Sequence, residues 1–324
     1  MTLHSHILTE EPLLYGDAAW ALGNAVRKFK TDVESRSYPA DDECYHLPAS
    51  LRQNNSACER RRHVTNPGNW ALVKETSMVE QIELHFLGSG DAFGSGGRFQ
   101  TCLYVHGLGD GFLIDCGASS LIALKRNRID PSKIHWILLS HLHGDHFGGL
   151  PFLILDGQFS GRTMPLVIAG PPGVAARVEA AMEIFFPGSS TVARRFPLEF
   201  VELAERAPTP VGPTNVTAHA VCHPSGSPSY ALRVQLGEKV ISYSGDTEWT
   251  DNLVDLAADA DVFVCEGYFF EKKIPYHLDY ATLLKHRSKL DCRRLIMTHM
   301  SEDLLHRLDE AKIEAAKDGS IVAL

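Results

Sequence analysis

The sequence predicts an α/β fold in which two β-sheets pack together and helices cover their outer faces. Strand-like segments dominate first and then alternate with helices, and this order occurs twice along the chain. Periodicity alone does not distinguish this arrangement from an open-sheet enzyme. A cluster of histidines and one aspartate directly follows a buried strand, and further His and Asp residues stand at the ends of later strands. The 324 residues are enough for one large domain with an extension.

The composition is that of an ordinary globular enzyme, with 44% hydrophobic and 22% charged residues. No apolar run approaches the roughly 20 residues that span a membrane, and the first residues lack a secretory pattern. The seven cysteines form no C-x-x-C pair, so we expect reduced thiols and a cytoplasmic protein. The net charge of −9 argues against broad, non-specific binding of nucleic acid.

Residues 1–77 differ in composition from the remainder and are predicted to be a peripheral extension. Asp17 can cap a helix over residues 17–33, whose apolar positions recur every three or four residues. Residues 48–77 are polar and rich in Asn, Ser and Arg, as linkers are. We therefore place the domain boundary between residues 77 and 78, with the main domain at 78–324.

The domain begins with an alternating strand at residues 82–87 that runs into a glycine-rich loop at 88–97. No Lys-Ser/Thr follows these glycines, which excludes a P-loop and favours a loop beside the active site. Residues 103–106 and 112–115 predict a hairpin. A helix is expected over 119–126, followed by a buried strand over 134–140.

The rest of the domain contains further strands and helices in alternation. Strands are expected at residues 165–169, 216–221, 230–234, 240–244, 262–265 and 295–298. Helices are expected at residues 173–185, 249–257, 280–289 and 302–316.

The densest chemical signal is the cluster of His141, His143, Asp145 and His146 after the strand at 134–140. Side chains two residues apart on an extended backbone point the same way, so His141 and His143 can bind one ion. Gly144 permits a sharp turn that directs Asp145 and His146 towards a second position. Imidazole and carboxylate donors suit zinc, or iron or manganese.

Three more ligand candidates follow later strands: His223, Asp246 and His299. Two divalent ions about 3.5–4 Å apart repel each other unless an anion lies between them, so a dinuclear site needs a bridging carboxylate. Asp246, in Gly245-Asp246-Thr247, fits that role.

Together these motifs resemble those of the metallo-β-lactamase superfamily, and within it the ribonuclease Z-like branch of phosphodiesterases, which includes cyclic phosphodiesterases. The resemblance covers essentially all of residues 78–324 and rests on Leu113-Ile114-Asp115, the H-x-H-x-D-H motif at 141–146, His223, Asp246 and His299. It implies an αβ/βα four-layer sandwich of two mixed sheets flanked by helices, with the site at one edge. It also implies two zinc ions, the first held by His141, His143 and His223 and the second by Asp145, His146 and His299. Asp246 would bridge them and Asp115 would orient the cluster.

Two further residues support the ribonuclease Z-like branch. Glu266 and His277 stand where those enzymes carry a Glu–His pair, in which the histidine protonates the leaving oxygen or contacts the phosphate. An imidazole with a near-neutral pKa suits proton donation to a leaving alkoxide. Lactamases and lactonases of the superfamily usually lack this pair.

The sequence thus predicts a binuclear metal-dependent hydrolase, a phosphodiesterase acting on a small or cyclic phosphodiester through a hydroxide shared by two Zn²⁺ ions, with Mn²⁺ or Fe²⁺ as alternatives. Its catalytic residues would be Asp145, His277 and Glu266. Three alternatives remain at this point: a ribonuclease Z-type endonuclease for transfer RNA, an ester, lactone or β-lactam hydrolase, and a catalytically silent metal-binding protein.

Structured RNA is the less favoured substrate. Ribonuclease Z enzymes have a long arm, inserted between the third histidine position and the Gly-Asp-Thr strand, that clamps transfer RNA. Here only 22 residues separate His223 from Asp246, which is too few for such an arm. Residues 78–324 carry 22 Lys and Arg against 30 Asp and Glu, although proteins that bind folded RNA usually have a basic face. We expect a small phosphodiester as substrate, no membrane partner and a homodimer.

Overall fold

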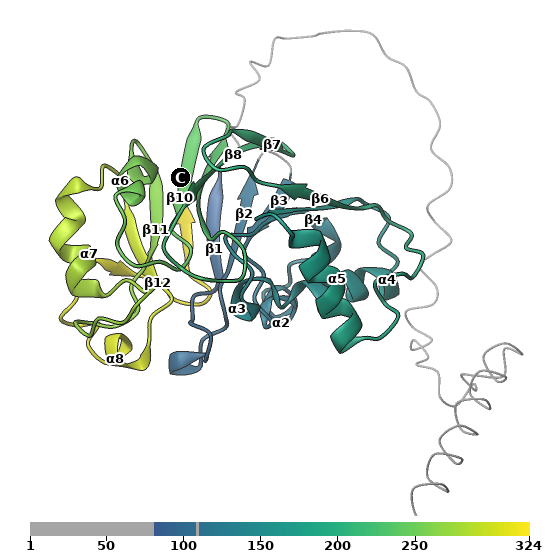
Figure 1. The fold of residues 1–324 in the computed structure, drawn as a ribbon, viewed down its shortest axis with the longest axis horizontal. Helices are drawn as coiled ribbons and strands as arrows, with labels where there is room; N and C mark the ends of the chain where they lie inside the picture. Colours follow the sequence, from purple (N-terminus) through teal and green to yellow (C-terminus); the bar gives the residue numbers. More distant parts are fainter. Residues whose placement is uncertain (1–80, 108–109) are drawn as a thin grey trace, which may run out of the picture. The chain divides into compact units, whose positions relative to one another are not determined.

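The computed structural model describes residues 81–107 and 110–324, which form four layers in the order helix, sheet, sheet, helix (Figure 1). The expected helix at 17–33 and linker at 48–77 lie outside the described residues. The two predicted sheets are therefore present, and each contains seven strands.

The first sheet has the order β14-β1-β2-β3-β4-β5-β6. Its members from β14 to β3 pair antiparallel, and those from β3 to β6 pair parallel. A central strand of a parallel sheet is buried on both faces, which explains the continuous apolar run in β4. The strands are β1 Glu83–Gly88, β2 Cys102–Gly107, β3 Asp110–Ile114, β4 Ile134–Leu138, β5 Leu166–Gly170, β6 Leu198–Glu202 and β14 Ile321–Ala323.

The second sheet has the order β13-β12-β11-β10-β9-β8-β7 and repeats this arrangement. Strands β7 to β10 pair antiparallel and β10 to β13 pair parallel. A two-residue turn joins β9 to β10, since Leu236 pairs with Lys239. The strands are β7 Thr209–Val211, β8 Thr214–Ala220, β9 Tyr230–Leu236, β10 Lys239–Tyr243, β11 Val262–Glu266, β12 Leu295–Thr298 and β13 Glu314–Ala315.

Helices cover the outer face of each sheet, with α4 and α5 on one side of the sandwich and α6, α7 and α8 on the other (Figure 1). The helices are α2 Ser120–Arg126, α3 Gly144–Phe147, α4 Leu150–Phe159, α5 Val174–Phe185, α6 Asn252–Ala257, α7 Tyr280–His286 and α8 Glu302–Leu305. Short 3-10 helices span Ser95–Gly97, Pro131–Lys133 and Arg287–Lys289. Within the described ranges, none of these helices is long and apolar enough to cross a membrane.

Three apolar clusters hold the layers together. The first lies between the sheets and contains inward-facing side chains of both, such as Phe86, Phe112 and Tyr243. The second packs α2, α4 and α5 on the outer face of the first sheet, and the third packs α6, α7 and α8 on the outer face of the second. Alternation along each strand therefore buries both faces of both sheets.

The sequence-based expectation is wrong about the length of one helix and missed the strands β6, β7, β13 and β14. The expected helix over 302–316 ends at Leu305, and the chain then returns to the second sheet as β13. The apolar side chains of this segment still pack on the third cluster, so their spacing is satisfied without a continuous helix. Helix α4 buries one face but also carries Phe152 and Phe159 on its exposed face, so apolar residues on both faces remove the periodic signal.

Candidate metal centre

The predicted site residues come together at the edge of the sheets where the parallel strands end. Asp115 follows β3, and the His141–His146 cluster follows β4. In the second sheet, Asp246 follows β10 and His299 follows β12. Because parallel strands present their carboxyl ends at one edge, these residues converge although 184 positions separate Asp115 from His299.

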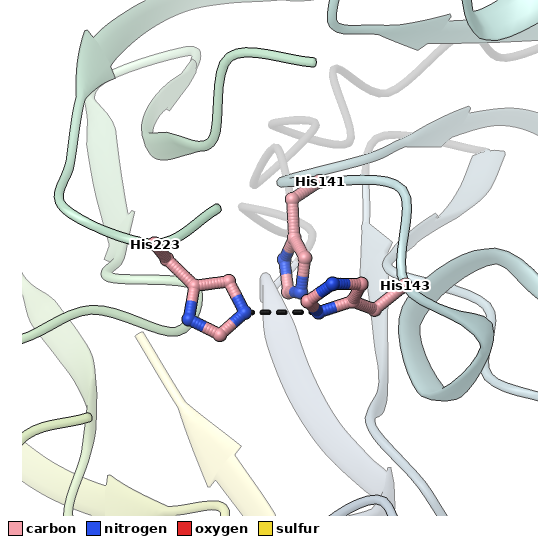
Figure 2. Close-up of side chains that lie close together, drawn as sticks. All are labelled: His141, His143 and His223. Atoms are coloured by element: carbon pink, nitrogen blue, oxygen red, sulfur yellow. Dashed lines mark hydrogen bonds between the residues drawn. The ribbon is translucent and has the colours of Figure 1, made fainter. Parts of the chain in front are cut away.

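Three histidines form the first ligand group, as Figure 2 shows. His141 and His143 come from the loop after β4 and His223 from the loop after β8, and one nitrogen of each lies within 4.8 Å of the others. His223 Nε2 lies 2.9 Å from His143 Nδ1. The His141 ring lies edge-on to the other two, with centroids 5.0 Å from His143 and 4.8 Å from His223.

A second group, made of Asp145, His146, Asp246 and His299, lies beside the first. Asp145 Oδ2 lies 3.2 Å from His146 Nε2 and 3.2 Å from His299 Nε2. His299 has a left-handed backbone conformation, with φ of 61°, at the end of β12. A non-glycine residue held in this conformation is a feature that clusters at functional sites.

Asp246 lies between the two groups. Its Oδ1 is 3.3 Å from His146 Nε2, and its Oδ2 is 3.3 Å from His299 Nε2. The same Oδ2 is 3.9 Å from Nε2 of both His141 and His223. Burial raises the pKa of Asp246, but the adjacent His146 and His299 outweigh burial and hold this pKa well below its usual range. An ionised carboxylate at this position has the geometry that a bridging ligand requires.

Several buried atoms of the site lack a hydrogen-bond partner within the described part of the chain. They include His141 Nε2, His146 Nε2 and Asp246 Oδ1. An unsatisfied buried polar atom costs about 1–3 kcal/mol, so three of them in one place fit residues that could hold a metal ion. Burial also lowers the pKa of His141, which favours the neutral imidazole that a metal binds. The donor set is all nitrogen and oxygen and fits zinc, iron or manganese.

Asp115 orients His146 directly and His141 through Ser140. Its carboxylate accepts hydrogen bonds from His146 Nδ1 at 2.7 Å and from the Ser140 backbone N–H and hydroxyl, both at 2.8 Å. Since the Ser140 hydroxyl donates to Asp115, its oxygen accepts from His141 Nδ1 at 3.0 Å. Both rings are therefore held with Nε2 directed into the site, and Ser140 is a contributor that sequence reasoning missed.

Glu266 and His277 form the expected pair beside the second group. His277 Nδ1 lies 2.5 Å from Glu266 Oε1, while Glu266 Oε2 accepts from Thr247 N at 2.7 Å. Glu266 is fully buried, whereas the His277 side chain is 22% exposed. Burial lowers the pKa of His277, but the hydrogen bond and charge of Glu266 outweigh burial and raise it. His277 Nδ1 is thus occupied, and its Nε2 remains available to a substrate.

Known proteins with similar sequences share most of this chain. Ribonuclease Z of Bacillus licheniformis is 27% identical over 294 residues, covering 71% of this chain and 94% of the relative. Ribonuclease Z of Limosilactobacillus fermentum is 27% identical over 277 residues, covering 68% of this chain and 88% of the relative.

Solved structures share the fold. The metallo-β-lactamase fold protein YhfI from Bacillus subtilis superposes with a TM-score of 0.63 at 18% identity, covering 76% of this chain and 100% of that one. The short form of human tRNase Z has a TM-score of 0.61 at 23% identity, covering 74% and 98%. The chain thus has the metallo-β-lactamase fold, as expected, and is a metal-dependent hydrolase whose sequence is similar to that of ribonuclease Z.

The family model described as anti-Pycsar protein Apyc1 matches residues 82–320. This range is most of the chain and includes both ligand groups, Asp115, Glu266 and His277. The chain therefore belongs to the anti-Pycsar protein Apyc1 family.

Proposed function

We propose that this protein is a phosphodiesterase that hydrolyses a small cyclic phosphodiester, such as a cyclic nucleotide, at the metal centre. The observation that carries the proposal is the Glu266–His277 pair at the rim of the two ligand groups. A leaving alkoxide needs a proton, and an imidazole whose Nδ1 is hydrogen-bonded to a buried carboxylate is suited to supply one from Nε2. Ester and lactam hydrolysis at such a centre does not explain this pair.

In the proposed reaction, the oxygen of water forms a bond to phosphorus as the bond from phosphorus to the leaving oxygen breaks. His277 Nε2 gives its proton to that leaving oxygen, and the ring opens to a phosphomonoester. Two ions at the site would supply Lewis acidity and lower the pKa of the attacking water. We assign His141, His143 and His223 to one ion, Asp145, His146 and His299 to the other, and Asp246 to both. Asp145 would also orient the attacking water.

Two features favour a compact substrate over transfer RNA. The segment between His223 and Asp246 consists mainly of β9 and β10, joined by the two residues Gly237 and Glu238, and so has no inserted arm. Residues 78–324 also have a net charge of −8, from 22 basic and 30 acidic side chains. Phosphate neutralisation by Lys and Arg supplies most of the affinity of proteins that bind folded RNA.

The test is a parallel screen of zinc- and manganese-loaded protein. The substrates are a series of cyclic mononucleotides, a linear dinucleotide, a lactone, a cephalosporin and a precursor transfer RNA. We expect the highest kcat/KM for a cyclic nucleotide. A higher kcat/KM for the transfer RNA than for every small diester would favour the ribonuclease Z function. Activity on the lactone or cephalosporin alone would contradict phosphodiesterase chemistry.

We also propose that the protein is a homodimer. Helices α4 and α5 expose large apolar side chains, with Phe159 86%, Ile184 77% and Phe185 51% exposed. The two helices contact each other, and exposed large apolar side chains on neighbouring helices are a feature of interfaces between subunits. Light scattering coupled to size exclusion should give twice the chain mass of 35.7 kDa. Phe159→Asp combined with Ile184→Asp should give the monomer mass, and an unaltered dimer would place the interface elsewhere.

A further inference from the structure

Glu248 lies outside both ligand groups but connects three segments of the site. It follows Asp246 by two residues, and its Oε1 accepts from Cys222 Sγ at 3.0 Å. Its Oε2 accepts from the backbone N–H of Tyr276 at 3.3 Å, and its own N–H donates to Cys222 O at 3.3 Å. Each of its contacts is therefore made to a neighbour of a site residue: Cys222 precedes His223, and Tyr276 precedes His277.

The turn that contains Tyr276 contributes to both halves of the site. Ile274 and His277 form an isolated antiparallel bridge, and Tyr276 between them has φ of 68°. The Tyr276 carbonyl accepts a hydrogen bond from His223 Nδ1 at 2.9 Å. The next residue, His277, pairs with Glu266. This turn therefore contacts the proposed ligand His223 through the Tyr276 carbonyl, and it also carries the proposed acid, His277.

This turn needs support from its surroundings. A tyrosine in the left-handed region is strained, and such conformations persist only where neighbouring groups fix them. Two hydrogen bonds hold this strained residue. Its N–H donates to Glu248, and its carbonyl accepts from His223. The N–H and the carbonyl of Tyr276 belong to successive peptide units that are joined at its Cα. Loss of the first bond therefore lets the φ and ψ angles of Tyr276 relax, which turns the carbonyl away from His223.

We propose that Glu248 is a positioning residue that acts on the metal centre through Tyr276. By fixing the turn, it keeps the Tyr276 carbonyl on His223 Nδ1, so that His223 Nε2 is unprotonated and faces the ion. The same contact keeps His277 at Glu266. The effect on His277 rests on the proposed function, whereas the effect on His223 requires only that the site binds metal.

The test compares Glu248→Met with Glu248→Gln. Both substitutions remove the charge and keep the length of the side chain, but only glutamine retains an oxygen that can accept from Tyr276 N. Metal retention is measured by competition with a chelator, without substrate. We expect Glu248→Met to weaken retention of one of the two ions by about 10-fold or more, as the loss of partners behind a ligand does. Glu248→Gln should stay within about threefold of the unaltered protein.

Two further variants distinguish the effect of the Glu248–Tyr276 contact from the effects of the Cys222 contact and of the lost charge. Cys222→Ala removes the thiol contact but leaves the bond between Glu248 and Tyr276, so metal retention should be preserved. Glu238→Ala removes an exposed glutamate in the β9–β10 turn and controls for the loss of charge. Equal retention in Glu248→Met and Glu248→Gln would overturn the proposal. So would a loss in Cys222→Ala as large as that in Glu248→Met.

Kinetics with excess metal then separate this inference from the proposed function. Glu248→Met should lose more kcat on a diester with a poor leaving group than on a nitrophenyl diester, because the second needs no proton donor. Weak metal retention with equal kinetic losses would support the effect on His223 and contradict the acid role of His277. Unchanged retention and unchanged kinetics would contradict the role of Glu248 itself.

Discussion

At the scale of single residues, the site is determined by which nitrogen of each ring is already occupied. His146 donates from Nδ1 to Asp115, His141 donates from Nδ1 to Ser140, and His223 donates from Nδ1 to the Tyr276 carbonyl. Each ring therefore presents Nε2 to the same centre. The ligand types and the role of Asp115 are predicted by the sequence motifs, but the contacts to Ser140 and to the Tyr276 carbonyl are not, because a hydroxyl and a backbone carbonyl have no motif of their own.

The position of Asp246 predicts its effect on metal content. Both of its oxygens lie within 3.3–3.9 Å of ligand nitrogens from the two groups. Elemental analysis of the purified protein should give about two ions per chain, because the seven ligand candidates exceed the four that one tetrahedral zinc needs. Asp246→Ala should lower this to at most one, while the surface variant Asp309→Ala should leave it unchanged. One ion in both the unaltered and the Asp246→Ala protein would contradict the bridging role.

The pairing of His277 with Glu266 predicts a loss that depends on the leaving group. His277→Ala should reduce kcat by about 10²–10⁴-fold on a diester whose leaving alkoxide needs a proton. The loss should be much smaller on a nitrophenyl diester, whose leaving group departs as an anion. His306→Ala, which removes a histidine with a side chain 79% exposed, is the control. Equal losses on both diesters would reject proton donation by His277.

At the scale of elements, ten of the fourteen strands in the described part of the chain were predicted, whereas β6, β7, β13 and β14 were not. β4, β10 and β12 are short, mainly apolar segments, and a ligand candidate follows each within three residues, so the sequence indicates both their type and their end. The bounds of helix α4 were not predicted because apolar residues lie on both its buried and its exposed face, and α8 was expected to be longer because its apolar spacing continues past Leu305. In both, tertiary packing decides the structure and local periodicity does not.

Arg162 connects several elements through its hydrogen bonds, and no sequence motif predicts this role. It is 4% exposed and follows α4, and its guanidinium donates to the carbonyls of Pro131, Ile134, Met164 and Pro165 at 2.6–3.0 Å. These carbonyls belong to the segments that begin β4 and precede β5. The arginine thus fixes the start of the strand that delivers the histidine cluster.

Replacing this arginine should lower stability without direct damage to the site. Arg162→Ala removes the donor to the buried carbonyl of Ile134 and to three partly buried carbonyls, which should lower the free energy of unfolding by about 2–4 kcal/mol. In a domain of this size, the thermal midpoint should then fall by roughly 5–12 °C. Arg195→Ala removes an exposed arginine nearby and should change the midpoint by less than about 2 °C. Similar midpoints for the two variants would show that the carbonyl contacts contribute little.

At the scale of the whole molecule, the two sheets contribute unequal parts of one site. The first sheet supplies the clustered ligands after β4 and the orienting Asp115, whereas the second supplies the single residues His223, Asp246, Glu266, His277 and His299. The centre therefore forms only when the sheets pack face to face through the cluster that includes Phe86, Phe112 and Tyr243. The sequence could predict each contribution, but their distances depend on this packing.

The domain from residue 78 onwards should fold and function without the extension. β1 begins at Glu83 and lies between β14 and β2, so the first sheet is complete within residues 83–323. All seven ligand candidates, Asp115 and the Glu266–His277 pair also belong to that range. A variant starting at Met78 should therefore keep its metal content and its kcat/KM on a small diester within about twofold, which corresponds to only about 0.4 kcal/mol.

A variant starting at Gly90 lacks β1 and should be insoluble, because the strand between β2 and β14 is missing. Loss of soluble protein on starting at Met78 would instead show that residues 1–77 are needed by the hydrolase domain.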